Sequence, residues 1–118
     1  MRTRVVFTGE YDIAVKEQLR DEFERLVEEP ILALDFTDVS YIDSTCVTEL
    51  LRLRELRKRL ALPTPTIVMK AGNPIRRIFD ILDLRSAFDL VEELDATETS
   101  VKHAFAGATD ELPTGNPG

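Results

Sequence analysis

The sequence predicts an α/β fold, with one domain, a four- to five-stranded and mostly parallel sheet, and about four helices. Short apolar runs alternate along the chain with longer amphipathic segments, and this alternation is typical of parallel strands joined by helical crossovers. The chain has 118 residues, of which 43% are hydrophobic and 31% are charged. That composition is ordinary for a folded domain with a core of its own.

The first part of the chain predicts a strand, a helix and a second strand. Residues 4–8 form the first strand, and Asp12 is the expected cap of the helix that follows. The apolar stripe of that helix is formed by Val15, Leu19, Phe23, Leu26 and Val27. The run 31–34 is uncharged, which predicts a second strand, over 31–36, that is covered on both faces.

A long amphipathic helix is expected over residues 44–60. Its apolar positions recur at steps of three and four, and they are Cys46, Leu50, Leu53, Leu56 and Leu60. The other side of the helix should carry Arg52, Arg54, Glu55, Arg57, Lys58 and Arg59. This mainly basic run indicates a solvated helix face, with a docking patch as the alternative.

The second half of the chain should add two strands and two helices. Residues 66–70 predict a strand, and Asn73 followed by Pro74 is a typical helix start. The stripe of this short helix consists of Ile75, Ile78, Phe79 and Leu82. Residues 87–91 predict a weaker strand. A final helix is expected from the capping-box spacing of Asp95 and Glu98 and from the apolar residues Val101, Ala104 and Phe105.

The domain is expected to span residues 1–106. Residues 107–118 lack any apolar period, so we expect a disordered C-terminal tail there. At the other end of the chain, residues 1–7 lack the apolar core of a signal peptide, and no segment is long enough to cross a membrane. A cytoplasmic protein is the resulting expectation.

Charge and composition restrict the classes of partner. A formal net charge of -7 repels phosphate backbones and anionic lipids, so we expect a protein partner and neither nucleic acid nor membrane insertion. One cysteine cannot form an internal disulfide, and with one histidine it is too small a ligand set for structural zinc. We therefore expect no metal and no cofactor.

Three loops are expected to meet at one edge of the sheet. These loops are 9–12, 37–43 and 71–73. Each follows a predicted strand, and open α/β folds gather the loops from the carboxyl ends of their parallel strands at one edge. Asp12, Ser44 and Asn73 should therefore share one surface, although they are far apart in the sequence.

Four segments of the chain resemble the successive landmarks of STAS domains. They are GEYD at 9–12, LDF at 34–36, VSYIDST at 39–45 and AGNP at 71–74. The resemblance extends over residues 4–106 and is greatest to the anti-sigma factor antagonists. Landmarks in the right order are more specific than any one short motif. The resemblance implies a STAS-like fold over the whole predicted domain.

The resemblance also implies a regulatory role for Ser44. In this family the serine at this position is phosphorylated by a serine kinase that is also the anti-sigma factor. The unphosphorylated antagonist binds that kinase and frees the sigma factor, and phosphorylation ends the binding. We therefore expect Ser44 to be the phosphorylation site. The partner-binding surface around it is expected to contain Asp12, Asp43, Ser44, Thr45, Cys46 and Asn73.

Several of these residues also have a purely structural interpretation. Ser44 could serve only as a helix cap, and Asp43 could fill that role one residue earlier. Thr45 is a second, weaker candidate for the phosphate acceptor. Cys46 could be a redox-sensitive thiol whose pKa is lowered by the helix dipole, but its place on the apolar stripe favours a buried core residue.

The chain departs from the family pattern at three places. Cys46 and Asp83 occupy positions where the family usually has glycine. Family members also commonly begin with one more strand, which here would have only Met1 to Thr3. One edge of the sheet is therefore expected to be bare or to pair with another chain.

A second functional class is a permanent STAS subunit of a larger assembly, such as a stressosome-like scaffold or a lipid-transporter subunit, with homo-oligomers as one form.

Enzymatic alternatives have less support. Ser44 lacks a Gly-x-Ser-x-Gly elbow, and His103 is expected in the final helix with nothing to bring it to the serine. Gly72 stands alone, so no phosphate-cradling loop is predicted. We therefore expect a binding protein and not an enzyme.

Overall fold

The structure, a computed structural model, describes residues 2–95 and 98–107. Its strands are β1 (Arg2–Tyr11), β2 (Leu32–Ile42), β3 (Thr66–Val68), β4 (Asp89–Val91) and β5 (Thr99–His103). Its helices are α1 (Lys16–Leu26), α2 (Ser44–Arg59) and α3 (Arg76–Ile81), with 3-10 turns η1 (Ile13–Val15) and η2 (Leu84–Ser86). Apart from Gly107, the tail expected over 107–118 lies outside the described residues.

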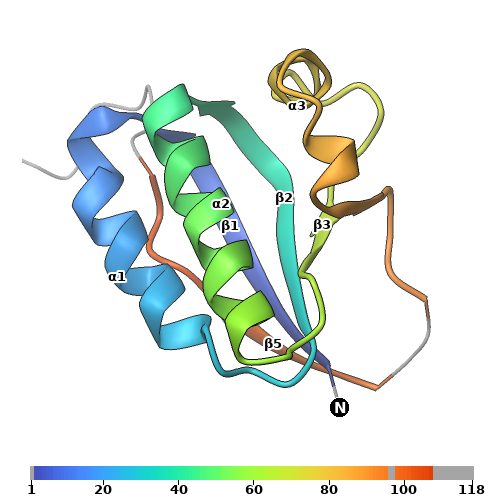
Figure 1. Ribbon diagram of the computed structural model, residues 1–118. Helices are drawn as coiled ribbons and strands as arrows, with labels where there is room; N and C mark the ends of the chain where they lie inside the picture. The colour runs from blue at the N-terminus through green and yellow to red at the C-terminus, as the bar shows by residue number, and fades with distance from the viewer. Residues whose placement is uncertain (1, 96–97, 108–118) are drawn as a thin grey trace, which may run out of the picture.

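The five strands form one parallel sheet in the order β4-β3-β2-β1-β5. This confirms the predicted α/β class. Helices α1 and α2 lie side by side against one face of the sheet, and α3 lies beyond β2 near the end of β3 (Figure 1). Since the strands are parallel, the carboxyl ends of β1 and β2 lie together at the edge where α2 begins.

The two faces of the sheet differ in chemistry because successive residues of a strand point to opposite faces. Phe7 of β1 is fully buried and its ring packs edge-on against Phe23 of α1 and Phe36 of β2, so this face holds the main core. Val6 and Asp35, which pair across β1 and β2, lie on the other face. One face of the sheet is therefore an apolar core, and the other carries a buried charge.

The predicted final helix is wrong: residues 99–103 form β5, an edge strand that pairs in parallel with β1. The strand forms because β1 offers unpaired backbone groups along its whole outer edge, and β-branched Thr99 and Val101 suit a strand. The edge of β1 that was expected to be bare is therefore covered by β5. His103 is exposed at the end of this strand and is not in a helix.

Several element boundaries also differ from the predictions. β1 continues to Tyr11 and β2 to Ile42, so most of the loop predicted at 37–43 is strand. The third helix begins at Arg76, three residues after the predicted cap Asn73. Leu82, which was placed on the buried stripe of that helix, is 44% exposed.

Arg57 was expected on the solvated side of α2, but its side chain is completely buried. The guanidinium donates hydrogen bonds to the carbonyl oxygens of Val27 (2.9 Å), Glu29 (2.5 Å), Pro30 (3.4 Å) and Pro63 (3.0 Å). These carbonyls belong to the segment between α1 and β2 and to the segment between α2 and β3. One side chain thus satisfies backbone acceptors that would otherwise be buried without a donor.

The chain after β5 is fastened along β1. The hydroxyl of Tyr11 donates a hydrogen bond to the carbonyl of Phe105 (2.7 Å), and the two rings pack edge-on. Gly107 N–H donates to the carbonyl of Thr8 (2.7 Å). A Cβ atom at Gly107 would lie 2.3 Å from the carbonyl oxygen of Glu10, so only glycine allows this approach.

Candidate functional site

The candidate site lies where β1 and β2 end and α2 begins. The backbone N–H of Asp43 donates a hydrogen bond to the carbonyl of Tyr11 (3.1 Å), which joins the ends of the two strands. Asp43 itself is still extended, with φ -94° and ψ 173°, and the helix begins at Ser44. The change from strand to helix therefore takes a single residue.

Asp43 is the N-cap of α2. Its Oδ1 accepts hydrogen bonds from the backbone N–H of Cys46 (3.0 Å) and from the hydroxyl of Thr45 (2.6 Å). Partial burial alone would raise the pKa of Asp43, but these hydrogen bonds outweigh it and hold the pKa below its ordinary value. The sequence left open whether Ser44 or Asp43 caps the helix, and in the structure the cap is Asp43.

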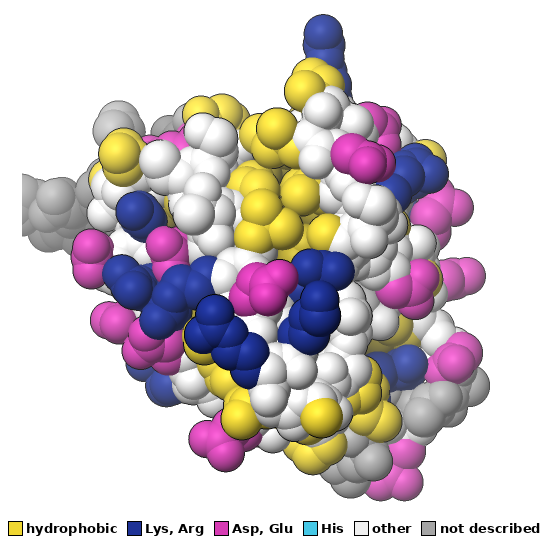
Figure 2. All heavy atoms as spheres, viewed as in Figure 1, with side chains coloured by type: hydrophobic (Ala, Val, Ile, Leu, Met, Phe, Trp, Pro, Cys, Tyr) yellow, Lys and Arg dark blue, Asp and Glu magenta, His cyan; other side chains and the backbone are white. Residues whose placement is uncertain are grey.

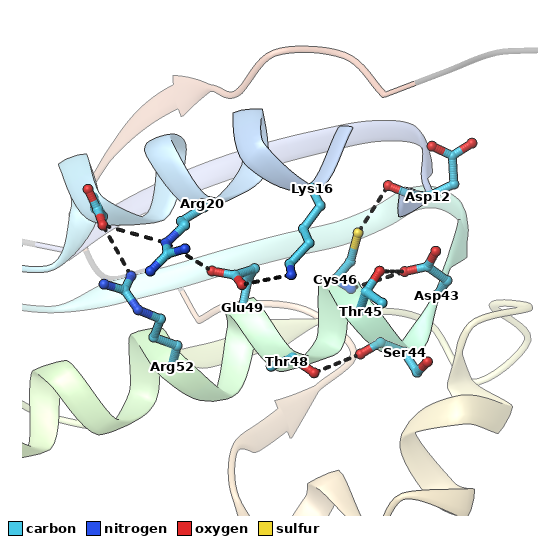
Figure 3. A network of polar contacts seen from close by, with 11 residues as sticks. Asp12, Lys16, Arg20, Asp43, Ser44, Thr45, Cys46, Thr48, Glu49 and Arg52 are labelled. Carbon is cyan, nitrogen blue, oxygen red and sulfur yellow. Dashed lines mark hydrogen bonds and ion pairs between the residues drawn. The ribbon is translucent and has the colours of Figure 1, made fainter. Parts of the chain in front are cut away.

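The hydroxyl of Ser44 is exposed and has no hydrogen-bond partner among the described residues. It points away from the Asp43 carboxylate, as Figure 3 shows. The carbonyl of Ser44 accepts a hydrogen bond from the hydroxyl of Thr48 (3.0 Å), one turn along the helix. The backbone of Ser44 is thus part of the helix, while its side-chain oxygen makes no hydrogen bond with the described residues.

Cys46 is buried, with no exposed surface, and its thiol donates to the carbonyl of Asp12 (3.3 Å). Burial, followed by the charge of nearby Asp43, raises the pKa of Cys46 to about 12. This is the opposite of the lowered pKa that a redox-sensitive thiol requires. The structure therefore supports the interpretation of Cys46 as a core residue.

Asp12 is brought to the start of α2 by this contact with Cys46 (Figure 3). Its carboxylate accepts a hydrogen bond from the N–H of Ala14 (3.0 Å), so it caps η1, which leads into α1. The predicted capping role is confirmed. Asp12 thus approaches α2 through its backbone carbonyl, while its carboxylate caps η1.

Asn73 is only 8% exposed and is fully engaged. Its amide nitrogen donates to the carbonyls of Phe36 (2.9 Å) and Thr37 (3.3 Å), and its amide oxygen accepts from the N–H of Ile75 (2.9 Å). The side chain ties the middle of β2 to the start of α3. It is therefore not displayed on the surface with Ser44, although its backbone follows β3 as predicted.

An apolar groove beside the site was not foreseen. It has a volume of about 300 Å³, and it is lined by Ser40, Tyr41, Ile42, Pro74, Ile75, Arg77, Ile78 and Ile81. Figure 2 shows apolar side chains gathered between α2 and α3 on this side of the molecule. The signal that the sequence offered is that Ile81 is apolar but falls outside the predicted stripe of this helix, and in the structure it is 68% exposed.

Ion pairs join α1 to α2 behind the site (Figure 3). Glu49 of α2 is 5% exposed and lies 3.7 Å from Arg20 and 4.0 Å from Lys16, both on α1. Arg52 of α2 pairs in turn with Glu24 of α1 (3.2 Å). These contacts add to the packing of α2 against α1.

Within the described ranges, no three histidine, cysteine or acidic side chains are grouped as a metal ion would require. Over the same residues, every helix is too short or too polar to span a lipid bilayer. The groups that converge at the site are hydroxyls, carboxylates and backbone amides.

Comparisons with known proteins agree with this architecture. The STAS domain family model matches residues 3–104. Among solved structures, the anti-sigma factor antagonist SpoIIAA in its unphosphorylated form is similar with a TM-score of 0.56 and 17% sequence identity, over 76% of this chain and 79% of that one. No curated protein sequence matches the chain. The family match spans nearly the whole described chain, and the protein therefore belongs to the STAS domain family.

Proposed function

We propose that this protein is an anti-sigma factor antagonist that acts by partner switching. It binds an anti-sigma factor serine kinase in the cytoplasm while Ser44 is unphosphorylated, and it releases the kinase once Ser44 is phosphorylated. Its effect on transcription is indirect, since it binds protein and not nucleic acid. Membership of the STAS family and the fold it shares with SpoIIAA support this proposal.

The observation that carries the proposal is the exposed, unbonded hydroxyl of Ser44 at the first position of α2. A capping serine would use its oxygen to satisfy a backbone N–H. Here Asp43 accepts from that N–H instead. A kinase could therefore reach and modify the Ser44 oxygen without removing a bond on which the helix depends.

Phosphorylation at this position would change the surface and leave the fold intact. The phosphate adds a charge of about -1.5 to -2 and three acceptor oxygens. The positive end of the helix dipole tolerates this anion. A docked partner, however, would have to bury a phosphate next to the acidic residue Asp43, and such a buried charge without a counter-ion is costly. Repulsion and desolvation would then release the partner.

The apolar groove next to Ser44 supports protein docking at this place. Ile42 lines the groove and is two residues from Ser44. In this proposal the partner contacts Asp12, Asp43, Ser44 and Thr45 directly. Cys46 and Asn73, both buried, shape the backbone underneath them.

The first test is the phosphorylation state of the protein isolated from its own cells. Intact-mass and phosphate-affinity gel measurements should show one phosphorylated species. Ser44→Ala should abolish it, whereas Thr45→Ala should retain it, because the Thr45 hydroxyl is bound to Asp43. Persistence of the species in Ser44→Ala would reject Ser44 as the acceptor.

The second test asks whether Ser44 controls binding. Protein carrying Ser44→Ala should retain its kinase during purification from native cells, and protein carrying Ser44→Asp should lose it. Thr48→Ala, one turn further along α2, is the matched control and should behave as the unmodified protein does. If the Ser44→Ala and Ser44→Asp proteins copurify with the same assembly equally well, the chain is a permanent subunit and not a switch.

A further inference from the structure

The face of the sheet opposite α1 and α2 contains a cavity of about 430 Å³. Its floor is built from four neighbouring strands and consists of Arg4, Val6, Asp35, Val68 and Val101. One wall is formed by residues 92–95, which follow β4. This volume is in the range of small-molecule sites. The cavity is on a different face of the sheet from the groove beside Ser44.

The floor of the cavity combines the Arg4–Asp35 ion pair with three valines and carries no net charge. Asp35 is only 1% exposed, and its carboxylate accepts hydrogen bonds from Arg4 Nε (2.8 Å) and from the N–H of Thr37 (2.9 Å). The charges of Asp35 and Arg4 cancel, and the other floor residues are valines. Such a floor fits the methylene chain of a ligand.

The rim of the cavity is acidic. It carries Asp38, Glu92, Glu93 and Asp95, against one cation, Lys70. Asp95 is paired with Arg2 (3.1 Å), and Glu92 accepts from the N–H of Ala71 (3.0 Å). Asp38 and Glu93 have no ion-pair partner in the part of the chain that the structure describes. The rim therefore keeps a negative charge that favours a cationic ligand.

The arrangement of the carboxylates distinguishes among cations. A metal ion needs several ligands that converge on one point, and the described residues contain no such group of three. The acidic side chains instead come from two separate parts of the chain: Asp38 is on β2, and Glu92, Glu93 and Asp95 are on the segment after β4. Separate ammonium groups could each pair with a different carboxylate, while the aliphatic chain that joins them lies along the valines.

We propose that this cavity binds an aliphatic ligand with two or more primary ammonium groups. The ammonium groups pair with Asp38 and Glu93, and the chain between them packs on Val6, Val68 and Val101. The ligand is either a free diamine or polyamine, or a diamino acid whose carboxylate meets Lys70. This inference goes beyond the proposed partner switch and does not depend on it.

Titration calorimetry at physiological salt tests the proposal with three probes: cadaverine, spermidine and L-lysine. Pentanediol and glutamate serve as the uncharged and anionic comparisons. Saturable binding of at least one ammonium probe, with none for the two comparisons, is expected. Binding by cadaverine or spermidine alone identifies an amine site, and binding by L-lysine alone identifies a diamino acid site. Absence of saturable heat for all three ammonium probes overturns the proposal.

Two variants locate the binding. The double variant Asp38→Asn/Glu93→Gln should weaken binding at least about tenfold. The control Glu17→Gln/Glu28→Gln removes the same charge from exposed positions outside the cavity and should leave affinity unchanged. Equal losses in the two double variants would assign the attraction to overall charge and contradict the proposal. Val101→Trp, at a half-exposed edge position, should also abolish binding by filling the cavity, and circular dichroism of each variant verifies the fold.

Discussion

The two ends of α2 are held in different ways. At the C-terminal end, the buried guanidinium of Arg57 donates to four backbone carbonyls from two separate segments. At the N-terminal end, Asp43 satisfies the backbone and the Thr45 hydroxyl, and the oxygen of Ser44 is left without a partner among the described residues. The C-terminal end is anchored by the buried side chain of Arg57, and the N-terminal end carries the exposed side chain of Ser44.

If Ser44 is the proposed recognition residue, this difference separates stability from recognition within one helix. Because the anchor is on the last turns of α2, the first turn can change its surface chemistry without loosening the helix. The cap at Asp43 strengthens that separation, since it frees the neighbouring serine from a structural role. Substitutions at the two ends should therefore have very different effects on the free energy of unfolding.

The largest effect is expected for Arg57→Met, which removes the donor of four buried hydrogen bonds. Unfolding by urea should show a loss of about 3 kcal/mol or more, because buried carbonyls left without donors are costly. Arg57→Lys should lose nearly as much, since an ammonium cannot reproduce the guanidinium fork. The exposed neighbour provides the control: Lys58→Met should change stability by less than about 0.5 kcal/mol. A loss below about 1 kcal/mol for Arg57→Met would contradict the anchoring role.

Asp43→Ala should cost about 1 kcal/mol by removing the cap of α2. The pKa of Asp43 is lowered in the folded protein, so the stability due to its charge is present above its unfolded pKa and is lost as pH falls through the folded pKa. The difference between the variant and the unmodified protein should therefore shrink in acid. Asp43→Asn keeps a capping oxygen and should lose only a few tenths of a kcal/mol at neutral pH. A difference that grows in acid would show that the charge of Asp43 is unfavourable in the fold.

Ala61→Gly should stabilise the protein by roughly 0.5–1 kcal/mol at the anchored end. Ala61 follows α2 with a φ of 56°, a left-handed conformation that costs any residue with a Cβ atom. The surrounding bonds, Leu62 N–H to Arg57 O and Ala61 N–H to Lys58 O, are those of a Schellman motif, in which glycine is preferred. Lys58→Gly, inside the helix, should instead lose about 1 kcal/mol. If both substitutions destabilise the protein equally, position 61 is not left-handed in solution.

Ser44→Ala should have the smallest effect on stability, within about 0.5 kcal/mol, because the lost hydroxyl has no partner in the described structure. Ser44→Asp should be equally neutral or slightly stabilising, since the helix dipole favours an anion at this position. Thermal melts of both variants provide the measurement. A loss above about 1 kcal/mol for Ser44→Ala would mean that the serine supports the helix, and the separation described above would fail.

The parts of the fold that follow from local patterns were predictable. The first turns of the α2 stripe, the buried strand after Pro30 and the polar turn at Asn73 each leave a signature within a few residues of sequence. The predicted stripe was wrong at Leu60, which is 52% exposed just beyond the end of α2. The meeting of Asp12 with the start of α2 was also predictable, because parallel strands bring their carboxyl ends together.

The parts that depend on distant contacts were not predictable. Residues 99–103 form a strand because β1 lies beside them with an unpaired edge. The sequence of residues 99–103 alone does not indicate that this edge is available. Arg57 looks like any charged residue on a basic helix face, and only the folded loops surround it with carbonyls. Whether Asp43 or Ser44 is the cap depends on where the helix begins. The two possibilities differ by one residue, and sequence patterns do not locate a helix boundary to a single residue.

The hydrogen bond from Gly107 to Thr8 determines where a label attached after Gly107 would lie. Gly107 lies near the carboxyl end of β1, at the rim where Asp12 and Ser44 are found, whereas Arg2 begins that strand at the opposite rim. A fluorophore or affinity handle placed after Gly107 would emerge near the proposed partner-binding surface around Ser44 and could obstruct it. The same handle joined ahead of Arg2 would leave that surface unencumbered.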